Sequence, residues 1–250
     1  MYKRQVLEAL QDPRLVLLDE ANQPDSVPRA KVMVSDTEWP SVAKLLFDEG
    51  IVLPIPDEDV ARCRGEMVLN GLFGVEKPSR APDGSEAQGP VALRTIMNLV
   101  PSNSLQVGIT GDIHTLPSPA RWRTLHLSED VALVWSEEDI QCMFYVFEMH
   151  PAWRPYFTFS KRVSWEALGV RRSGSTLLAS RVLPMGWVSA TGCAQQFLRR
   201  LATLPIPRGA GELMSQELRK DRPSPFKLGQ AVVEIWMAYL DNKCLSLIHI

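Results

Sequence analysis

The hydrophobic residues between positions 42 and 47 recur at the spacing of one face of an α-helix. They are Val42, Leu45, Leu46 and Phe47. Gly50 follows this pattern, and glycine is common just beyond the last turn of a helix. A second helix is predicted over 189–202, where Arg199 and Arg200 form part of a basic side.

Short apolar runs bounded by turn-prone residues predict β-strands. The run at 51–55 contains Pro54, so it is predicted to be an edge strand, because proline has no N–H group to donate inside a sheet. The runs at 67–75 and 93–100 predict two strands joined by a loop rich in Pro, Gly, Ser and Ala. Further strands are predicted at 131–135, 156–159 and 177–183.

The end of the sequence has the pattern of a β-hairpin. Apolar residues at 235–238 precede the pair Asp241-Asn242, and a second apolar run covers 244–250. Asp and Asn tolerate turn dihedrals, so we expect this pair at the tip of the hairpin, with the Asp241 carboxylate held outward. The same pair is also good turn chemistry without any function, so taken alone it indicates no site.

Composition indicates a folded chain with an uneven charge distribution. The 250 residues are 45% hydrophobic and 22% charged, which is enough for one large or two small domains. Residues 1–150 carry 13 Lys and Arg against 23 Asp and Glu, whereas residues 151–250 carry 14 against 6. This asymmetry suggests that the second part meets an anionic partner, although ordinary surface solvation accounts for it equally well.

The cysteines and the hydropathy profile predict an intracellular protein that is not secreted and does not meet a membrane. Four cysteines lie far apart without a C-x-x-C pair, as expected for free thiols in a reducing compartment. The charged N-terminal segment does not have the pattern of a signal peptide. No apolar run approaches the roughly 20 residues that a membrane-spanning helix needs.

Five motifs, in this order and spacing, resemble those of the reverse transcriptases of retroelements. Each motif is weak alone, and their order and spacing make the resemblance specific. It covers roughly residues 39–243. The motifs are the fingers-like segments 73–78 (FGVEKP) and 93–103 (LRTIMNLVPSN), the first catalytic motif at 139–145 (DIQCMFY), the second at 183–187 (LPMGW), and the turn at 239–242 (YLDN).

The resemblance implies an α+β fold, with the fingers and palm of a right-hand polymerase and an antiparallel palm sheet packed on helices. It implies an N-terminal extension and linker over 1–38, fingers over 39–125 and a palm over 126–250. The sequence ends nine residues after Asp241, so the thumb is expected to be absent. The last six residues, LSLIHI, resemble translated adapter sequence more than family sequence, which suggests a truncated or chimeric reading frame.

The resemblance also implies a reaction and a metal site. The reaction is RNA-directed DNA synthesis, in which two divalent cations about 3.5–4 Å apart assist an in-line displacement at phosphorus. Asp139 and Asp241 are the implied catalytic carboxylates, and the backbone carbonyl of Ile140 is a further metal ligand. Oxygen ligands of this kind suit Mg²⁺, with Mn²⁺ as a substitute.

The implied substrates are deoxynucleoside triphosphates and an RNA or DNA template-primer. By the same resemblance Lys77 and Arg94 contact the triphosphate, and Phe144 is the ring that excludes a ribose 2′-hydroxyl. Met185 and Gly186 border the new base pair, although retroviral members usually have Gln at the position of Met185. From the residues alone, a solvated loop is the better interpretation of Lys77 and Arg94.

Two departures from the family pattern predict weak activity or none for the chain as given. Asn242 stands where a second Asp is common in the turn, and it offers an oxygen without a charge. The missing thumb is expected to impair primer positioning, and an error of about 1 Å can reduce a rate about a hundredfold. The alternative is an inactive remnant that binds nucleic acid through its Arg-rich part. An unrelated hydrolase has no support, because neither H-E-x-x-H nor a nucleophile elbow is present.

Overall fold

The structure is a computed structural model that describes residues 2–77, 92–118, 120, 132–204, 216–223, 233–239 and 242–249. The side chains are placed for all of these except 2–5, 77, 92, 132–139, 233–235 and 242–249. The chain forms two compact units. Unit 1 comprises Met1–Val6, Ile109–Met143 and Ser189–Ile250, and unit 2 comprises Leu7–Gly108 and Phe144–Val188.

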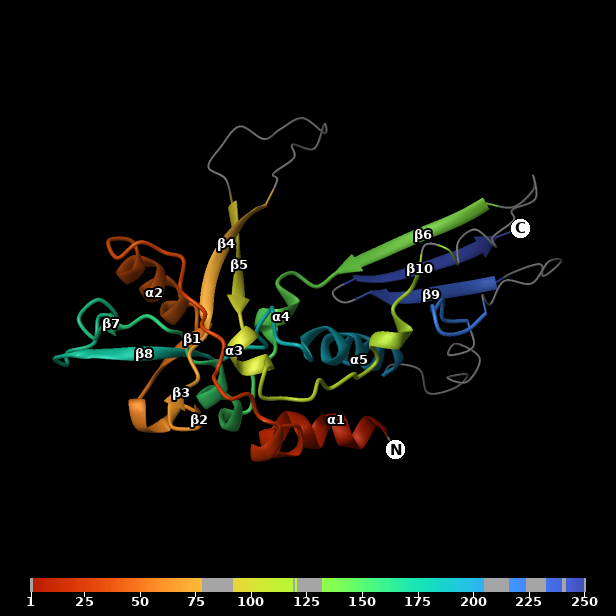
Figure 1. The fold of residues 1–250 in the computed structure, drawn as a ribbon. Helices are drawn as coiled ribbons and strands as arrows, with labels where there is room; N and C mark the ends of the chain where they lie inside the picture. The colour runs from red at the N-terminus through yellow and green to blue at the C-terminus, as the bar shows by residue number, and fades with distance from the viewer. Residues whose placement is uncertain are drawn as a thin grey trace. The chain divides into compact units, whose positions relative to one another are not determined.

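Unit 2 contains a three-stranded antiparallel sheet and two antiparallel hairpins (Figure 1). The sheet has the order β1-β8-β7, with β1 (Val52–Ile55), β7 (Val163–Ser164) and β8 (Ser175–Ser180). The hairpins are β2 (Arg62–Cys63) with β3 (Glu66–Met67), and β4 (Gly71–Lys77) with β5 (Ala92–Asn98). Its α-helices are α1 (Tyr2–Gln11) from Leu7 onward, α2 (Trp39–Asp48), α3 (Val100–Asn103) and α4 (Met143–Val146) from Phe144 onward. Its 3₁₀ helices are η1 (Pro13–Leu15), η2 (Glu20–Asn22), η3 (Asp57–Asp59) and η6 (Pro151–Phe157).

Stacked aromatic rings form a central part of the core of unit 2. Trp153 and Phe157 are stacked with their ring centroids 5.4 Å apart, and Trp187 meets Trp153 edge-on at 4.8 Å. The indole Nε1 of Trp153 donates to the carbonyl oxygen of Leu10 over 3.0 Å, so its single polar atom is satisfied. Offset and edge-on ring pairs stabilise a core beyond the area that they bury. Further apolar clusters join β1 to β8 and β2–β3 to Leu105.

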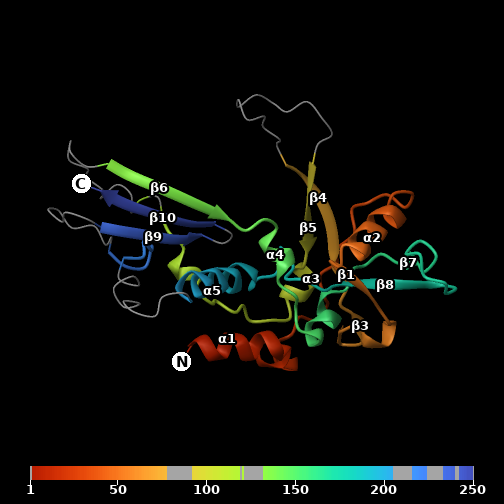
Figure 2. The same ribbon diagram turned by 180° about the vertical axis from the view of Figure 1, so that it is seen from behind.

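Unit 1 is a three-stranded antiparallel sheet packed against one long helix. The sheet has the order β6-β10-β9, formed by β6 (Ala132–Asp139), β10 (Asn242–His249) and β9 (Val233–Tyr239). Helix α5 (Ala190–Thr203) lies alongside β9 in both ribbon views, and η4 (Ile113–Thr115) lies near it (Figures 1 and 2). The protein is therefore a mixed α and β structure with antiparallel sheets, compatible with the α+β class.

Several predicted elements are confirmed. Helix α2 begins at Trp39 beside Pro40 and ends before Gly50, whose φ of +69° is a conformation that favours glycine. The strand with Pro54 is an edge strand, as its missing N–H requires. Helix α5, the β4–β5 hairpin and the terminal hairpin also form close to their predicted residues.

Two predictions are wrong. Residues 156–159 are no regular strand, because 3₁₀ helix η6 extends to Phe157 and only isolated β-bridges follow. Arg199 does not belong to a basic surface of α5, because it is buried among acidic partners, whereas Arg200 is exposed. The predicted domain limits at 38 and 125 stay predictions. In the described part of the chain, no helix combines the length and apolarity that crossing a membrane needs.

Replacing Trp153 tests the aromatic core of unit 2. Trp153→Ala is expected to lower the free energy of unfolding by about 3–5 kcal/mol, because it removes a fully buried ring and leaves a cavity. Trp153→Phe keeps a ring and loses the N–H bond, so it should cost less, about 1–3 kcal/mol. Urea denaturation followed by circular dichroism measures both values. Equal losses for the two variants would contradict the packing role of the ring.

Candidate functional site

One end of the sheet in unit 1 brings together three positions of the predicted catalytic motifs. The Cα of Asn242 is paired with that of Asp139 on one side and with that of Tyr239 on the other. Asp139, Asn242 and Tyr239 therefore lie abreast on β6, β10 and β9. Neighbouring strands are about 4.8 Å apart, so Asp139 and Asn242, which are 103 positions apart in the sequence, become cross-strand neighbours.

Asp241 itself lies outside the described residues, as does Leu240 before it. Tyr239 and Asn242 flank these two residues and are paired with each other. Of Asp139 and Asn242 the structure gives the backbone positions alone. Among the residues whose side chains are described, no group of three or more His, Cys, Asp or Glu side chains could hold a metal ion.

The donors available at this end of the sheet suit a hard divalent cation. Asp139 carries a carboxylate, Asn242 an amide oxygen, and Ile140 follows Asp139 with a backbone carbonyl. Magnesium prefers oxygen ligands, and it needs carboxylates from separate elements when two ions share a site. On donor type these residues suit one such cation, and the second carboxylate of the predicted pair, Asp241, lies outside the described residues.

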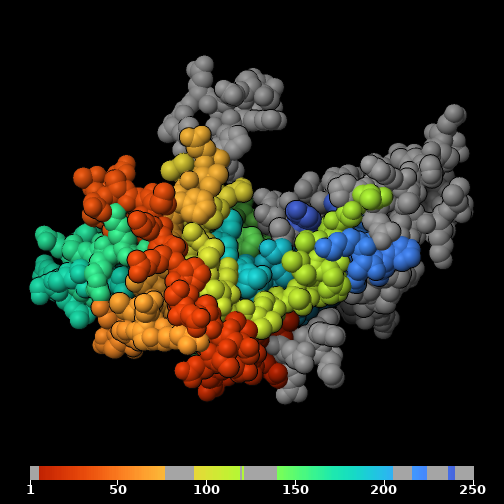
Figure 3. All heavy atoms as spheres, in the orientation of Figure 1, coloured from red at the N-terminus to blue at the C-terminus, as the bar shows by residue number. Residues whose placement is uncertain are grey.

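The outer edge of β9, away from β10, is covered by residues 216–218. Leu218 N donates to Trp236 O over 2.7 Å and Trp236 N donates to Gln216 O over 3.5 Å, which makes a short parallel bridge at Glu217. Lys220 N donates to Leu116 O in the segment after η4. Figure 3 shows residues 109–118 in yellow-green beside residues 216–223 in blue. The strand that leads to Asp241 is thus braced by segments from two other parts of the chain.

Arg199 of α5 connects these segments through buried ion pairs. Its Nε and Nη2 atoms donate to the two carboxylate oxygens of Glu217 over 2.6 and 2.7 Å, and its Nη1 atom donates to Asp112. The side chain of Glu217 is 1% exposed and that of Arg199 is 8% exposed. Burial disfavours the charged guanidinium, but bonds to Glu217 and the charges of Glu217 and Asp112 outweigh it, so the pKa of Arg199 lies above its ordinary value.

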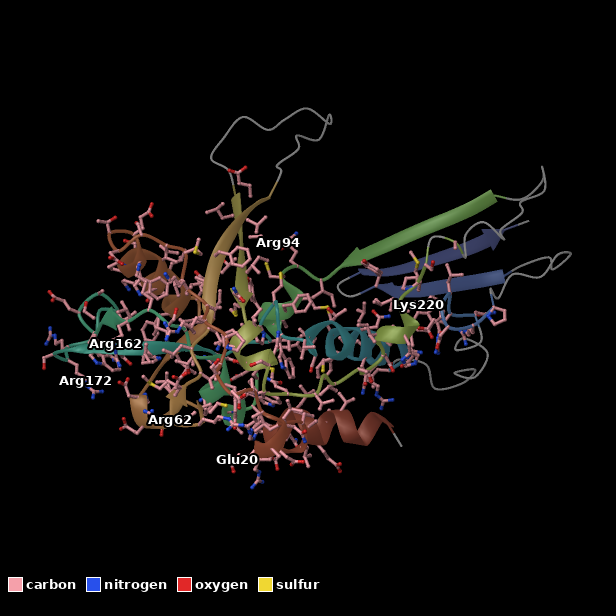
Figure 4. The ribbon with its side chains drawn as sticks, viewed as in Figure 1. Glu20, Arg62, Arg94, Arg162, Arg172 and Lys220 are labelled. Atoms are coloured by element: carbon pink, nitrogen blue, oxygen red, sulfur yellow. The ribbon has the colours of Figure 1, made fainter. Side chains whose placement is uncertain are left out.

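The predicted triphosphate contacts lie on the β4–β5 hairpin of unit 2. Arg94 is exposed on β5, where Figure 4 labels it, and its Cα pairs with that of Val75. Position 77 pairs with Ala92, two residues further along the same hairpin. Because strand positions alternate with a period of two, positions 77 and 94 belong to the same face of the ribbon. The loop beyond them, at 78–91, lies outside the described residues.

The turn at Pro184–Trp187 is fixed against the end of β5. Met97 N donates to Met185 O over 3.1 Å, and Asn103 Nδ2 donates to Gly186 O over 2.9 Å. Gly186 has a φ of +118°, and an added Cβ would overlap the carbonyl oxygen of Met97. Only glycine allows this close approach of two backbones. The glycine that the resemblance assigns to the base-pair border is therefore required by the local backbone.

Helix α4, which contains the end of the first predicted catalytic motif, also reaches β5. Tyr145 Oη donates to Thr95 O over 3.1 Å, and the adjacent Phe144 is half-buried in α4. Arg94, the pair Phe144-Tyr145 and the turn at Met185 come from three separate segments of the sequence. They meet at β5 through the strand itself, through the Tyr145 hydroxyl and through the backbone bond between Met97 and Met185. Unit 2 thus places Arg94, Met185 and Gly186 at β5, Phe144 next to a residue that is bonded to β5, and position 77 on the neighbouring strand.

Many cations of the basic part of the sequence are already paired with acids. Arg162 pairs with Asp57, and Arg181 donates from Nε to Glu148 over 3.0 Å. Hydrogen bonds from Arg181 hold the pKa of Glu148 below its ordinary value. Arg172, labelled in Figure 4, lies over the ring of Trp165 with 4.6 Å between the guanidinium carbon and the ring centroid. The number of Arg and Lys residues in this part therefore overestimates the positive charge that is left to bind a partner.

The predicted metal ligands Asp139, Ile140 and Asp241 belong to unit 1, together with Asn242. The nucleotide-contacting positions Lys77, Arg94, Phe144, Met185 and Gly186 belong to unit 2. Sequence reasoning missed Gln195 and Glu217, which brace β9, because a single Gln or Glu carries no local signal of burial.

A scan against protein-family models and a search of curated proteins find no match.

Replacing Arg199 tests the bracing of β9. Arg199→Met is expected to lower the free energy of unfolding by about 3–5 kcal/mol, because it leaves the buried charge of Glu217 without its partner. Arg200→Met on the same helix is the matched control and should stay within about 0.5 kcal/mol of the original protein, because Arg200 is exposed. Urea denaturation measures both. A loss for Arg199→Met no larger than that of the control would contradict the buried ion pair.

Proposed function

We propose that this chain is the fingers and part of the palm of a retroelement reverse transcriptase. The reaction of the parent enzyme is RNA-directed DNA synthesis from deoxynucleoside triphosphates. The observation that carries the proposal is the register that aligns Asp139 of the first motif with Asn242 of the turn motif. The two motifs are predicted from the sequence independently, and nothing in their local pattern requires them to be neighbours. A strand pair that aligns them supports a shared site.

In this proposal Asp139, Asp241 and the carbonyl of Ile140 hold two Mg²⁺ ions. When bound, such ions activate the primer 3′-oxygen and neutralise charge on the leaving pyrophosphate. The carboxylates would come from two parts of the sequence, the end of β6 and the residues between β9 and β10, and the pairing of Asn242 with Asp139 supports a common location. Asn242 contributes an uncharged oxygen next to Asp241, so the negative charge at the site is lower than in relatives with two turn acids.

Unit 2 would hold the incoming nucleotide. Arg94 and Lys77 lie on one face of the hairpin, where cations can contact a triphosphate. Phe144 is held near β5 by the bond of its neighbour Tyr145, and the Met185-Gly186 backbone is fixed at Met97. The gathering of these positions at β5 supports a nucleotide-facing role for this part of unit 2. The buried and paired arginines make nucleic-acid binding by the Arg-rich part alone the weaker alternative.

Mn²⁺ binding followed by electron paramagnetic resonance tests the metal site even if turnover is slow. Asp139→Asn and Asp241→Asn are each expected to weaken Mn²⁺ binding by more than about 100-fold, because a direct ligand matters more than the outer-shell partners whose loss costs 10–100-fold. Glu138→Gln removes the adjacent acid of the same strand and serves as the control. Unchanged affinity in both aspartate variants would refute the proposal.

Restoring a second acid to the turn is expected to strengthen the site. Asn242→Asp should raise Mn²⁺ affinity about tenfold, since a full charge about 4 Å from an ion contributes on the order of 1–4 kcal/mol in a partly exposed site. Primer extension on a primed RNA template, with Mg²⁺ and deoxynucleoside triphosphates, should rise in parallel and vanish in Asp139→Asn. Template binding that depends on salt but is indifferent to both substitutions would favour the inactive remnant.

A further inference from the structure

Gln195 is an unusual residue for the buried face of a helix. It is fully buried on α5, and its Nε2 atom donates to Ala238 O over 2.8 Å and to Thr115 Oγ1 over 3.2 Å. A buried amide is costly unless it is hydrogen-bonded, and an apolar residue of similar size would fill the same space. Packing alone therefore does not require an amide here, and the bond to Ala238 is the feature to explain.

The bond completes the outer edge of β9. Trp236 directs its N–H and carbonyl groups to this edge, where residues 216–218 satisfy them. Strand residues two positions apart direct these groups the same way, so the carbonyl of Ala238 also faces the edge. Residues 216–218 do not extend to it. The side chain of Gln195 takes their place and is bonded three residues before Asp241.

Arg199 lies one turn further along α5 and fixes the same edge through Glu217, the bridge partner of Trp236. Residues four apart share one face of a helix, so Gln195 and Arg199 act side by side. One helix face thus holds β9 at two successive edge positions. Of these two side chains, Gln195 is bonded nearer the end of β9, at Ala238.

We infer that Gln195 is a positioning residue for the proposed metal site, because it fixes the end of β9 through the carbonyl of Ala238, three residues before Asp241 in the sequence. This inference rests on the proposed function, because it assigns the turn a metal-binding role. Gln195 touches neither metal nor substrate. Its effect is that of an outer-shell partner, whose loss typically weakens metal binding about 10- to 100-fold.

The test compares Mn²⁺ affinity with thermal stability in four variants. Gln195→Met removes the amide, and Gln195→Asn withdraws it by one methylene with little loss of volume. Both are expected to weaken Mn²⁺ binding at least about tenfold in protein that circular dichroism shows to be folded. Gln196→Met, on the neighbouring half-buried residue, should leave the affinity unchanged.

Thr115→Val separates positioning from stability. It removes the Thr115 hydroxyl, which accepts a bond from Gln195, from a buried position and leaves the bond to Ala238, so it should lower the melting temperature while changing Mn²⁺ affinity less than about twofold. Should Gln195→Met fail to fold, Gln195→Asn and Thr115→Val still decide the question. Affinity that follows the melting temperature equally in all variants would overturn the positioning role.

Asp139→Asn distinguishes the two ways of failing. If Asp139→Asn abolishes Mn²⁺ binding while Gln195→Asn binds as the original protein does, the positioning role is wrong and the metal site stands. If Asp139→Asn leaves Mn²⁺ binding unchanged, the proposed function itself is wrong. Loss of binding in Asp139→Asn together with weakening in Gln195→Asn supports both.

Discussion

The antiparallel pairing of β6 with β10 is the constraint on which the candidate site depends. A shift of one residue in this register would move every side chain of β6 to the other face of the sheet. It would also separate Asp139 from Asn242, its present cross-strand partner. The pairing extends over eight consecutive positions from Asn242 to His249, which makes such a shift costly. A site built from two distant motifs needs a register of this length to keep its donors together.

The position of the hairpin is set by polar groups rather than by apolar packing alone. Apolar contacts between a helix and a sheet are non-directional, so they tolerate sliding that hydrogen bonds do not. Gln195 and Arg199 meet fixed acceptors on Ala238 and Glu217, at 2.8 and 2.6 Å. A buried ion pair contributes little net stability, since desolvation offsets much of the attraction. Its main effect here is to select one position of β9 on α5.

Local patterns in the sequence predicted the elements well and their partners poorly. Helix α2, the edge strand β1 and the terminal hairpin follow from spacing, Pro54 and turn residues, all of which act within a few positions. The segment at 156–159 misled because its aromatic residues favour strands, while Pro151 and Pro155 favour the 3₁₀ helix that forms. The basic side assigned to α5 failed for another reason. The partners of Arg199 are Glu217 and Asp112, at separations of 18 and 87 residues, which no helical pattern contains.

The candidate site could likewise be predicted in its residue types and not in their arrangement. The sequence could supply the residue types, because the motif order names Asp139 and the Asp241 turn, but it could not supply the register or the bracing that align them. The register in turn gives a physical meaning to Asn242. An Asp at 242 would stand directly across from Asp139 and beside Asp241, and like charges opposite each other destabilise a strand pair. In the proposed metal site, Asn242 would relieve that repulsion when no cation is bound and would give up part of the attraction to a bound cation.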